Sequence, residues 1–355
     1  MATIKEIAQL AAVSTTTVSN VLNGKPGAAS EAKAKEIVDL ANRLSYTPNA
    51  LAKGLKQRKS NSIGIITEDL TVFNAPEIVD GVDAYCEEHG YEIILANMRL
   101  FKRYNNNFTD TPQHQEILDA VVRNLMAKQV EGLIYVGYHC RELHCLPTTL
   151  SVPMVYAYCY PQNMQYSAVL YDDEKAAYDV TTLLTAKGHT KIGILSGPMT
   201  SFHSQCRLRG VQRALFDHGV LYNANAVLYG DWSRHAGYEA AKTLVDQGCT
   251  AIFAFNDLMA SGLYEWCAEQ GLEVGKQISL FGFDNRDISS GYMHKISTVE
   301  LPLNEIGQKS AELVLRQVAG HKAKTEKTFL PCRILERNSI GTAPETAAKA
   351  EKSEM

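Results

Sequence analysis

The sequence predicts an α/β protein in two parts, an all-helical head of about sixty residues and a larger body with two parallel sheets. In the head, apolar residues recur at helical spacing in three segments. Beyond it, nine short apolar runs mostly alternate with helical segments, which is typical of parallel sheets built from crossover connections. Nine strands suit two open sheets better than one, so we expect a body of two lobes.

The head is expected to contain three helices, at residues 4–11, 14–22 and 30–44. Thr3 and Glu6 have the spacing of a capping box before the first helix. Ser14 is a residue type that caps the second. The apolar stripe of the second helix consists of Val13, Val18, Val21 and Leu22. The third is expected to bury Ala34, Ile37, Val38, Ala41 and Leu44.

The second predicted helix carries small hydroxylated side chains that can approach base edges, at Thr15, Thr16 and Thr17. A short turn separates it from the first helix, which is typical of a helix-turn-helix whose second helix enters the DNA major groove. Thr17 can alternatively bond the backbone or a phosphate, and Asn20 can simply face solvent.

A short fourth helix is predicted at residues 49–56, with Pro48 at its first position. This helix is too short to be stable alone. The polar run QRKSNS follows, so we place the domain boundary near residue 60.

The body is expected to alternate strands and helices. The strands are predicted at 62–67, 91–97, 130–137, 153–160, 168–173, 191–197, 226–231, 250–257 and 278–284. The helices are predicted at 76–89, 113–128, 174–187, 205–218, 234–247, 257–270 and 302–318. Residues 328–340 return the chain to the sheets, and residues 341–355 are expected to be disordered.

Charge is divided unevenly between head and body. Residues 1–60 hold nine Lys/Arg and four Asp/Glu, a net charge of +5, whereas the remainder holds 26 and 35, a net charge of −9. This division concentrates attraction to phosphates at the head, although a chance cluster of solvated lysines would give the same count.

No signal peptide or membrane-spanning run is evident, so we expect a cytoplasmic protein whose eight cysteines are structural free thiols. The segment YHCRELHC could offer zinc ligands. However, no second Cys/His pair stands at zinc-finger spacing, so no metal site or other cofactor is predicted.

The chain resembles the lactose/galactose repressor family of bacterial transcription regulators (LacI/GalR) over nearly its whole length. The resemblance is carried by ATIKEIAQLAAVSTTTVSNVLNG, YTPNALAKGLK, GHTKIGILSGP, CRLRGV, AFND, FGFDN and LPCRILERNS. It implies a helix-turn-helix head, a hinge helix and a two-lobed body like a periplasmic sugar-binding protein. The implied ranges are 1–47 for the head, 48–61 for the hinge helix and linker, and 62–340 for the body. Lobe one is placed at about 62–161 plus 292–325, and lobe two at about 162–291 plus 326–340.

The resemblance implies a homodimer that binds a pseudo-palindromic operator in double-stranded DNA, with Leu55 pushed into the minor groove. Thr15, Thr16 and Asn20 are the implied base-reading residues. Many relatives have Arg at the position of Asn20, so operator preference is expected to differ there. The full set of expected DNA contacts is Thr3, Ser14, Thr15, Thr16, Thr17, Ser19, Asn20, Asn23, Tyr46, Asn49, Lys53, Leu55 and Lys56.

The resemblance also implies a small-molecule effector, most simply a sugar, in the cleft between the lobes. The implied effector-binding residues are Phe73, Asn74, Tyr158, Arg207, Trp232, Asn256 and Asp284. Asp257 is interpreted as a helix N-cap, a role that Asp284 could also take. Tyr158 stands where relatives often have Asp, and Val136 or its neighbour where a polar residue is expected. An aromatic, flatter wall is therefore predicted from Tyr135, Tyr138, Tyr156, Tyr158 and Tyr160, with a lengthened loop at 101–112.

Alternatives to a sugar-controlled repressor are a nucleoside or purine-like effector, and an activator or co-repressed regulator. An enzyme acting on sugars is a more distant alternative, because the chain lacks a phosphate loop, a GxGxxG turn after a strand and a GxSxG elbow. A periplasmic transport receptor conflicts with the basic head and the missing signal peptide.

Overall fold

A computed structural model describes residues 3–46, 60–105, 109–286, 296–321 and 324–344. The chain divides into two compact units, residues 1–60 and residues 61–355. The predicted helix at 49–56 and most of the tail from residue 341 lie outside the described residues. No described helix is long and apolar enough to span a membrane.

The head consists of α1 (Ile4–Leu10), α2 (Thr15–Leu22) and α3 (Glu31–Arg43). They meet in a small apolar core to which Ile7, Val18 and Ile37 each contribute a fully buried side chain. The capping box of α1 is present as predicted. The expected burial of Val38 is wrong: it is 40% exposed, and Leu40 is buried instead. Leu40 lies three positions after Ile37, on the same face of the helix.

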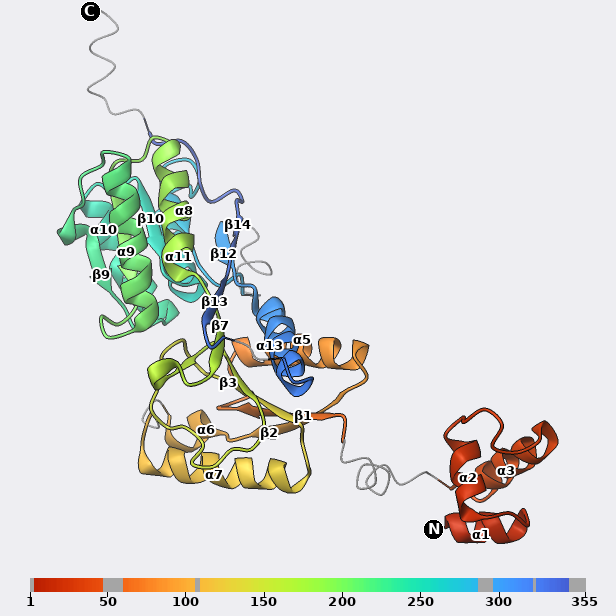
Figure 1. The fold of residues 1–355 in the computed structure, drawn as a ribbon. Coiled ribbons are helices and arrows are strands. Elements are labelled where there is room, and N and C mark those ends of the chain that lie inside the picture. Colours follow the sequence, from red (N-terminus) through yellow and green to blue (C-terminus); the bar gives the residue numbers. More distant parts are fainter. Residues whose placement is uncertain (1–2, 47–59, 106–108, 287–295, 322–323, 345–355) are drawn as a thin grey trace, which may run out of the picture. The chain divides into compact units, whose positions relative to one another are not determined.

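The first sheet of the body has six strands in the order β13-β7-β5-β3-β1-β2, all of them parallel. Helices α5 (Asn74–Glu88) and α13 (Leu303–Val318) cover one face, and α7 (Pro112–Ala127) covers the other (Figure 1). The strands are β1 (Ser62–Thr67), β2 (Glu92–Asn97), β3 (Gly132–Val136), β5 (Met154–Ala157), β7 (Ser167–Tyr171) and β13 (Lys327–Leu330).

The second sheet has four strands in the order β11-β10-β8-β9, again all parallel. Helices pack in pairs around it, α8 (Asp173–Ala186) with α9 (Phe202–Asp217) and α10 (Arg234–Asp246) with α11 (Asp257–Glu269). The strands are β8 (Ile192–Ser196), β9 (Val227–Tyr229), β10 (Ala251–Ala254) and β11 (Ser279–Phe281).

The lobe boundaries differ from those expected at residues 161 and 325. Strand β7 and strand β13 pair with each other inside the first sheet, so the chain leaves lobe one only after Tyr171 and after Leu330. Strand propensity identifies these segments as strands. It does not say which sheet they join, because that depends on partners far away in the sequence.

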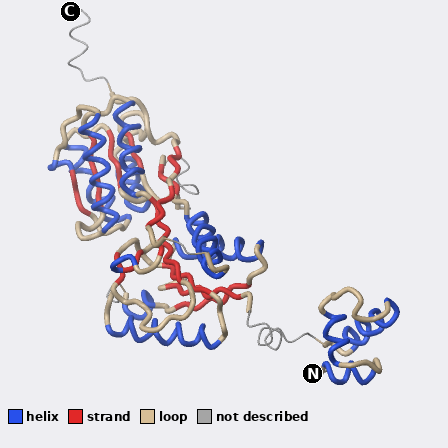
Figure 2. The backbone as a smooth tube through the Cα atoms, in the orientation of Figure 1, coloured by secondary structure: helices blue, strands red, loops and turns tan. Residues whose placement is uncertain are grey.

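The described chain crosses between the lobes at three places: near residue 172, between residues 284 and 303, and near residue 331. A two-stranded antiparallel sheet lies at the crossings, formed by β12 (Thr298–Glu300) and β14 (Arg333–Leu335). Figure 1 labels these strands beside lobe two, above β13; in Figure 2 they are the red strands at the same place. Glu300 links the crossings, because it is ion-paired with Arg333 and accepts a hydrogen bond of 2.9 Å from Asn285.

The lengthened loop expected at 101–112 is partly helical. Its first residues lie in α6 (Leu100–Tyr104), and Pro112 already begins α7. Two short strands that pair with each other follow β3 and β5 in the chain: β4 (Glu142–Leu143) and β6 (Tyr160–Pro161). Two 3-10 helices complete the described elements, η1 (Gln162–Met164) and η2 (Ala224–Ala226).

Candidate functional site

The expected DNA-reading helix is α2, and its first turn is organised by Ser14. The Ser14 hydroxyl accepts from the backbone N–H of Thr17 at 3.0 Å, and it also contacts the Thr17 hydroxyl at 2.9 Å. Thr17 is therefore partly engaged with the helix terminus. Thr15 and Thr16 are exposed on the same turn. Two adjacent hydroxylated side chains thus remain available at the helix start, where a recognition helix makes its base contacts.

The other expected DNA contacts in the head have varied surroundings. Asn23 donates to the backbone carbonyl of Ser19 at 2.6 Å, one turn earlier in the chain. Asn20 is partly exposed, and Tyr46 packs against the head core. Thr3 is exposed but takes part in the capping box. The remaining expected contacts lie outside the described residues: Asn49, Lys53, Leu55 and Lys56.

A cavity of about 600 Å³ lies between the two lobes of the body. We call it the interlobe cavity. All seven residues expected to bind effector line it: Phe73, Asn74, Tyr158, Arg207, Trp232, Asn256 and Asp284. Sequence reasoning did not assign five other lining residues to this cavity: Arg141, His139, His203, Asp231 and Arg286. Many of these residues directly follow the carboxyl ends of strands, which is where ligands bind in open α/β sheets.

Arg207 of α9 is buried at the floor of the cavity, with 3% of its side chain exposed. Its Nε donates to Asp173 at 2.6 Å, one Nη donates to the Tyr171 hydroxyl at 3.0 Å, and the other donates to the Phe255 carbonyl. The guanidinium also lies 3.5 Å from the centre of the Phe283 ring. Four neighbours thus fix the plane of the guanidinium.

Asp173 is the shared partner of Arg207 and His203. Burial works to raise the pKa of Asp173, but His203 and Arg207 outweigh it and hold that pKa below its usual value. His203 Nδ1 lies 2.8 Å from the carboxylate, and its Nε2 accepts from the backbone N–H of Cys140 at 3.4 Å. This last contact links α9 of lobe two to a loop of lobe one.

Asn256 is the N-cap of α11, so the interpretation of Asp257 as the cap is wrong. The Asn256 side chain accepts from the backbone N–H of Met259 at 2.8 Å and donates to the Trp232 carbonyl at 3.0 Å. Asp257 is the first residue inside the helix, where it accepts from the Thr298 hydroxyl at 2.7 Å. Of two adjacent polar residues, the one with extended backbone takes the cap, and that is Asn256.

Trp232 has a left-handed backbone, with φ of 72°. Its indole lies so close to Gly197 that a Cβ there would come within 2.1 Å of the ring. Tyr158 and Asp284 also have positive φ, of 63° and 103°. Such conformations cost of order 1–3 kcal/mol each in non-glycine residues and gather at ligand sites.

Asp284 has a side chain that is 9% exposed. Burial raises the pKa of Asp284 to about 8, although Arg207, 3.8 Å away, opposes this shift. The raised pKa favours the protonated form of the carboxyl group, which can donate a hydrogen bond. Burial also lowers the pKa of His139, another residue of the cavity lining, to about 3.

The wall from lobe one is built on a buried ion pair between Glu68 and Arg141, 2.6 Å apart. Glu68 also accepts from the Tyr135 hydroxyl at 2.6 Å and from the backbone N–H of Tyr138 at 2.6 Å. Burial works to raise the pKa of Glu68, but Arg141 and Tyr135 bring it below its usual value.

The predicted aromatic wall is only partly right. Tyr138 and Tyr158 line the cavity, with Phe101 stacked on Tyr138 at 5.4 Å. Tyr135 and Tyr156 are fully buried in the lobe-one core, and Tyr160 is buried there as well. Their strands are covered on both faces, so a tyrosine there points into the core as readily as toward the cavity.

Two further residues contribute from the start of α5. Asn74 is fully buried and donates to the Gly137 carbonyl at 3.0 Å, while its Oδ1 has no hydrogen-bond partner among the described residues. Phe73 lies under the guanidinium of Arg286, 4.9 Å from the ring centre.

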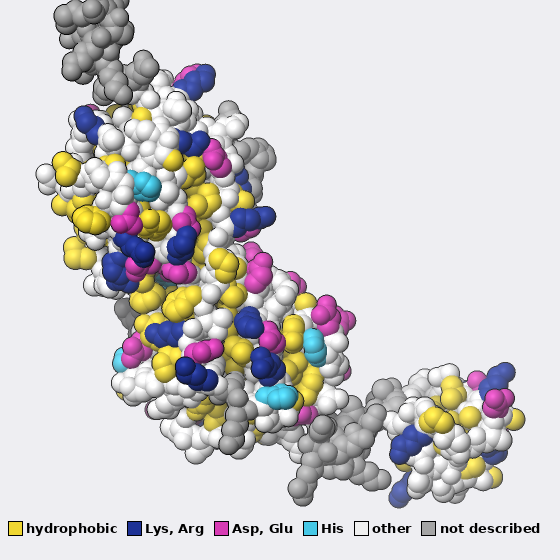
Figure 3. Space-filling view, turned by 45° about the horizontal axis from the view of Figure 1, so that its top comes forward, with side chains coloured by type: hydrophobic (Ala, Val, Ile, Leu, Met, Phe, Trp, Pro, Cys, Tyr) yellow, Lys and Arg dark blue, Asp and Glu magenta, His cyan; other side chains and the backbone are white. Residues whose placement is uncertain are grey.

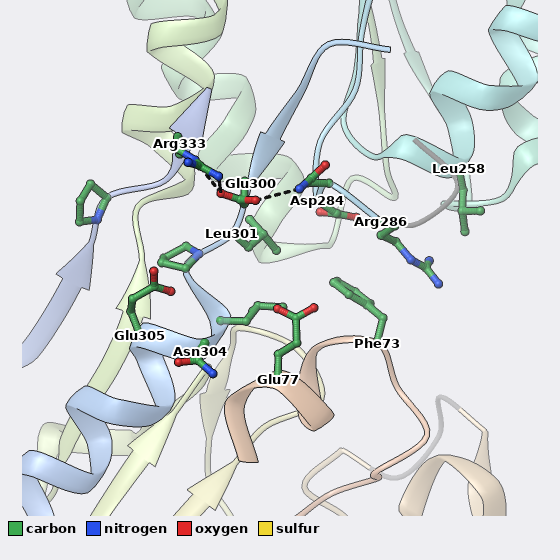
Figure 4. Close-up of a pocket in the computed structure, with 14 residues that line it drawn as sticks. Phe73, Glu77, Leu258, Asp284, Arg286, Glu300, Leu301, Asn304, Glu305 and Arg333 are labelled. Atoms are coloured by element: carbon green, nitrogen blue, oxygen red, sulfur yellow. Dashed lines mark hydrogen bonds and ion pairs between the residues drawn. The ribbon is translucent and has the colours of Figure 1, made fainter. Parts of the chain in front are cut away.

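A second cavity, of about 1030 Å³, adjoins the first and shares Phe73, Leu258, Asp284 and Arg286 with it. Figure 4 shows it between the start of α5, the start of α13 and the crossing strands. Glu77, Glu300 and Glu305 line it, and Arg333 is ion-paired with Glu300. The interlobe cleft therefore continues as far as the chain crossings.

On the face of the body seen in Figure 3, side chains of opposite charge lie intermixed over both lobes. A helix-turn-helix head and a two-lobed body with a cavity between its sheets define a class of DNA-binding transcription regulators. Three comparisons with known proteins make this more specific.

A family model described as "Bacterial regulatory proteins, lacI family" matches residues 3–49, and one described as "Periplasmic binding protein-like domain" matches residues 181–340. Catabolite control protein A of Priestia megaterium is 30% identical over 341 residues, covering 95% of this chain and 98% of that protein. The HTH-type transcriptional repressor PurR of Vibrio cholerae serotype O1 is 28% identical over 347 residues, covering 96% and 98%. A crystal structure of the lac repressor dimer bound to operator and the anti-inducer ONPF matches with a TM-score of 0.76 and 26% identity, covering 95% and 98%.

The chain belongs to the lacI family of bacterial regulatory proteins. The predicted family and fold class are confirmed, and the protein is a DNA-binding regulator rather than an enzyme.

Proposed function

We propose that this protein is a transcriptional repressor whose operator affinity is controlled by a small molecule bound in the interlobe cavity. The observation that carries the proposal is that all seven expected effector residues line that one cavity. By analogy with the lac repressor dimer on its operator, the protein binds a pseudo-palindromic site as a homodimer. Thr15, Thr16 and Asn20 read bases, and Leu55 enters the minor groove.

The charges around the cavity favour a neutral polar effector. Arg207 and Arg141 are each compensated by a carboxylate, Asp173 and Glu68, which form no part of the cavity lining. The remaining charged lining residues, Arg286 and Asp231, contribute one charge of each sign. Because the raised pKa of Asp284 favours its neutral form, these pairs bring the formal charge of the lining close to zero, which disfavours a phosphorylated ligand.

The polar groups of the cavity suit a molecule with several hydroxyl groups. Arg207, Asn256 and Asp284 can donate to ring oxygens or hydroxyls, and Trp232 offers an apolar face for a sugar ring. The unpartnered Oδ1 of Asn74 is an acceptor for a ligand hydroxyl. A sugar or glycoside is therefore our leading effector class. A nucleoside or purine-like molecule is the alternative, favoured by the aromatic rings of Phe73, Phe101 and Tyr138.

The effector class can be tested by thermal shift with neutral sugars, nucleosides and their phosphorylated forms. A ligand at 100 times its dissociation constant stabilises by about 2.7 kcal/mol. We expect a neutral compound to raise the melting temperature of wild-type protein and to change its operator affinity. If only phosphorylated compounds stabilise the protein, the neutral-cavity reasoning is wrong. If no compound changes operator affinity, control through this cavity is wrong.

The DNA-binding part can be tested with Leu55→Ala on an operator selected from random DNA. An apolar wedge acts only at the specific site, so specific binding should weaken far more than non-specific binding. Equal losses on both kinds of DNA would contradict the proposed wedge. Wild-type affinity should also fall steeply with salt, because phosphate contacts release counterions.

A further inference from the structure

Three side chains with different ligand atoms meet in lobe one, away from the lining of the interlobe cavity. Asp110 lies in the turn before α7, His114 in the first turn of α7, and Cys145 two residues after β4. One potential ligand atom from each lies within 4.8 Å of those of the other two. We propose that these residues form a metal-binding site suited to Zn²⁺.

The combination of ligand atoms points to zinc rather than to a hard cation. Zinc binds carboxylate oxygen, imidazole nitrogen and thiolate sulfur at about 2.0–2.3 Å, whereas Mg²⁺ and Ca²⁺ prefer oxygen alone. Tetrahedral bonds of those lengths set ligand atoms roughly 3.3–3.8 Å apart. The upper limit of 4.8 Å between the potential ligand atoms is about 1 Å wider than this spacing. Three protein ligands leave the fourth position for water.

The hydrogen bonds of His114 fix which ring nitrogen faces the ion. The Tyr135 hydroxyl has one proton, which it donates to the Glu68 carboxylate at 2.6 Å. Its contact of 3.0 Å with His114 Nε2 therefore requires Nε2 to carry the proton and to donate it. Nδ1 is left as the metal ligand. Metal-binding histidines usually have such an N–H partner behind the ring, which orients it.

Asp110 holds the cysteine segment in place. Its Oδ1 accepts from the backbone N–H of His144 at 2.9 Å and of Cys145 at 3.0 Å. His114 is fully buried and Cys145 is 6% exposed, whereas Asp110 is partly exposed and offers a path for the ion. On binding, the Cys145 S–H bond breaks, a zinc–sulfur bond forms, and the proton leaves to solvent.

The test uses the full-length reduced protein, freed of metal by a chelator and titrated with Zn²⁺ and separately with Co²⁺. We expect one site per chain and a thiolate-to-cobalt absorption band. Cys145→Ser should abolish that band and weaken Zn²⁺ binding at least tenfold. Cys267→Ser, which removes a buried thiol in lobe two, is the matched control and should bind as wild type does.

Asp110→Asn keeps the fold testable, because the amide oxygen can still accept both backbone N–H groups while its charge is lost. It should also weaken Zn²⁺ binding at least tenfold, with an unchanged circular dichroism spectrum. A cobalt spectrum without the thiolate band, or equal Zn²⁺ affinity in wild type and Cys145→Ser, overturns the proposal. The proposal is also overturned if His144→Ala loses Zn²⁺ binding while Cys145→Ser and Asp110→Asn keep it, because the ion would then lie at the surface.

Discussion

Arg207→Ala is the substitution whose effect the structure specifies best. The side chain is 3% exposed, and its loss leaves Asp173 in the interior with His203 as its remaining ionisable partner. The Tyr171 hydroxyl and the Phe255 carbonyl lose a donor at the same time. The variant should therefore lose both stability and the effector response, while the separate head keeps its operator contacts at temperatures where the body is folded.

The expected loss of stability is about 4 kcal/mol. Removing one member of a buried ion pair costs about 3–5 kcal/mol, because the other charge remains in the interior without compensation. In a body of this size, about 4 kcal/mol corresponds to a fall in melting temperature on the order of 8 °C. Adding Asp173→Asn removes the uncompensated charge and should restore about 2 kcal/mol.

The assay is unfolding by denaturant and by heat, with Arg209→Ala as the control. Arg209 lies on the same helix and pairs with Glu174 at 3.2 Å, but its side chain is 54% exposed. Exposed ion pairs contribute about 0–1 kcal/mol. If the two variants lose equal stability, or if Arg207→Ala loses less than about 1 kcal/mol, the assignment of a buried pair is refuted. A variant that still responds to effector would remove Arg207 from the binding site.

Three further predictions concern the cavity. Gly197→Ala should weaken effector binding at least about tenfold, because the new Cβ would displace the Trp232 ring. Operator affinity without effector should not change. An unchanged effector titration would contradict the prediction. Asn256→Ala should lower the free energy of unfolding by about 1–2 kcal/mol, because it removes the cap of α11. A loss below about 0.5 kcal/mol would argue against this. The pKa of Asp284 is about 8 in the folded protein, above its ordinary value of 3.8. Ionisation is therefore harder in the folded state, so the free energy of unfolding of the wild type should fall between about pH 4 and pH 8. Asp284→Asn, which cannot ionise there, should not show this fall. Melting temperatures measured across that range test this, and a constant difference between the two proteins would be the contrary result.

The strands of the body were predictable because their apolar runs are buried on both faces and bounded by helical segments. SIGIIT and KIGILSG contain strands whose described residues are all buried. The assignment of β7 and β13 to the first sheet was not predictable, because no local property of a strand names its neighbour. The same reason explains why the sequence did not reveal which segments cross between the lobes.

The candidate site shows a similar division. The resemblance to a known family selected seven residues that line one cavity, but it did not show what holds them. The sequence shows Asp173 only as a carboxylate that follows a strand. Glu68 could not be predicted as a partner of Arg141, because an ion pair between residues 73 positions apart leaves no local pattern. Asp110, His114 and Cys145 likewise have no motif spacing, because the start of α7 and a loop about thirty residues later in the chain bring them together.

The three chain crossings near residues 172, 284–303 and 331 have a mechanical consequence. Under the proposed control by an effector, we expect the backbone to bend at these crossings when the lobes close. Strand β1 runs from Ser62, where the linker from the head arrives, toward the cavity, a length of roughly 20 Å for six residues. A rotation of about 10° about the cavity end of β1 would move Ser62 by roughly 3.5 Å. The linker therefore joins β1 at the end farther from the cavity, where such a rotation would displace the chain more than at Thr67.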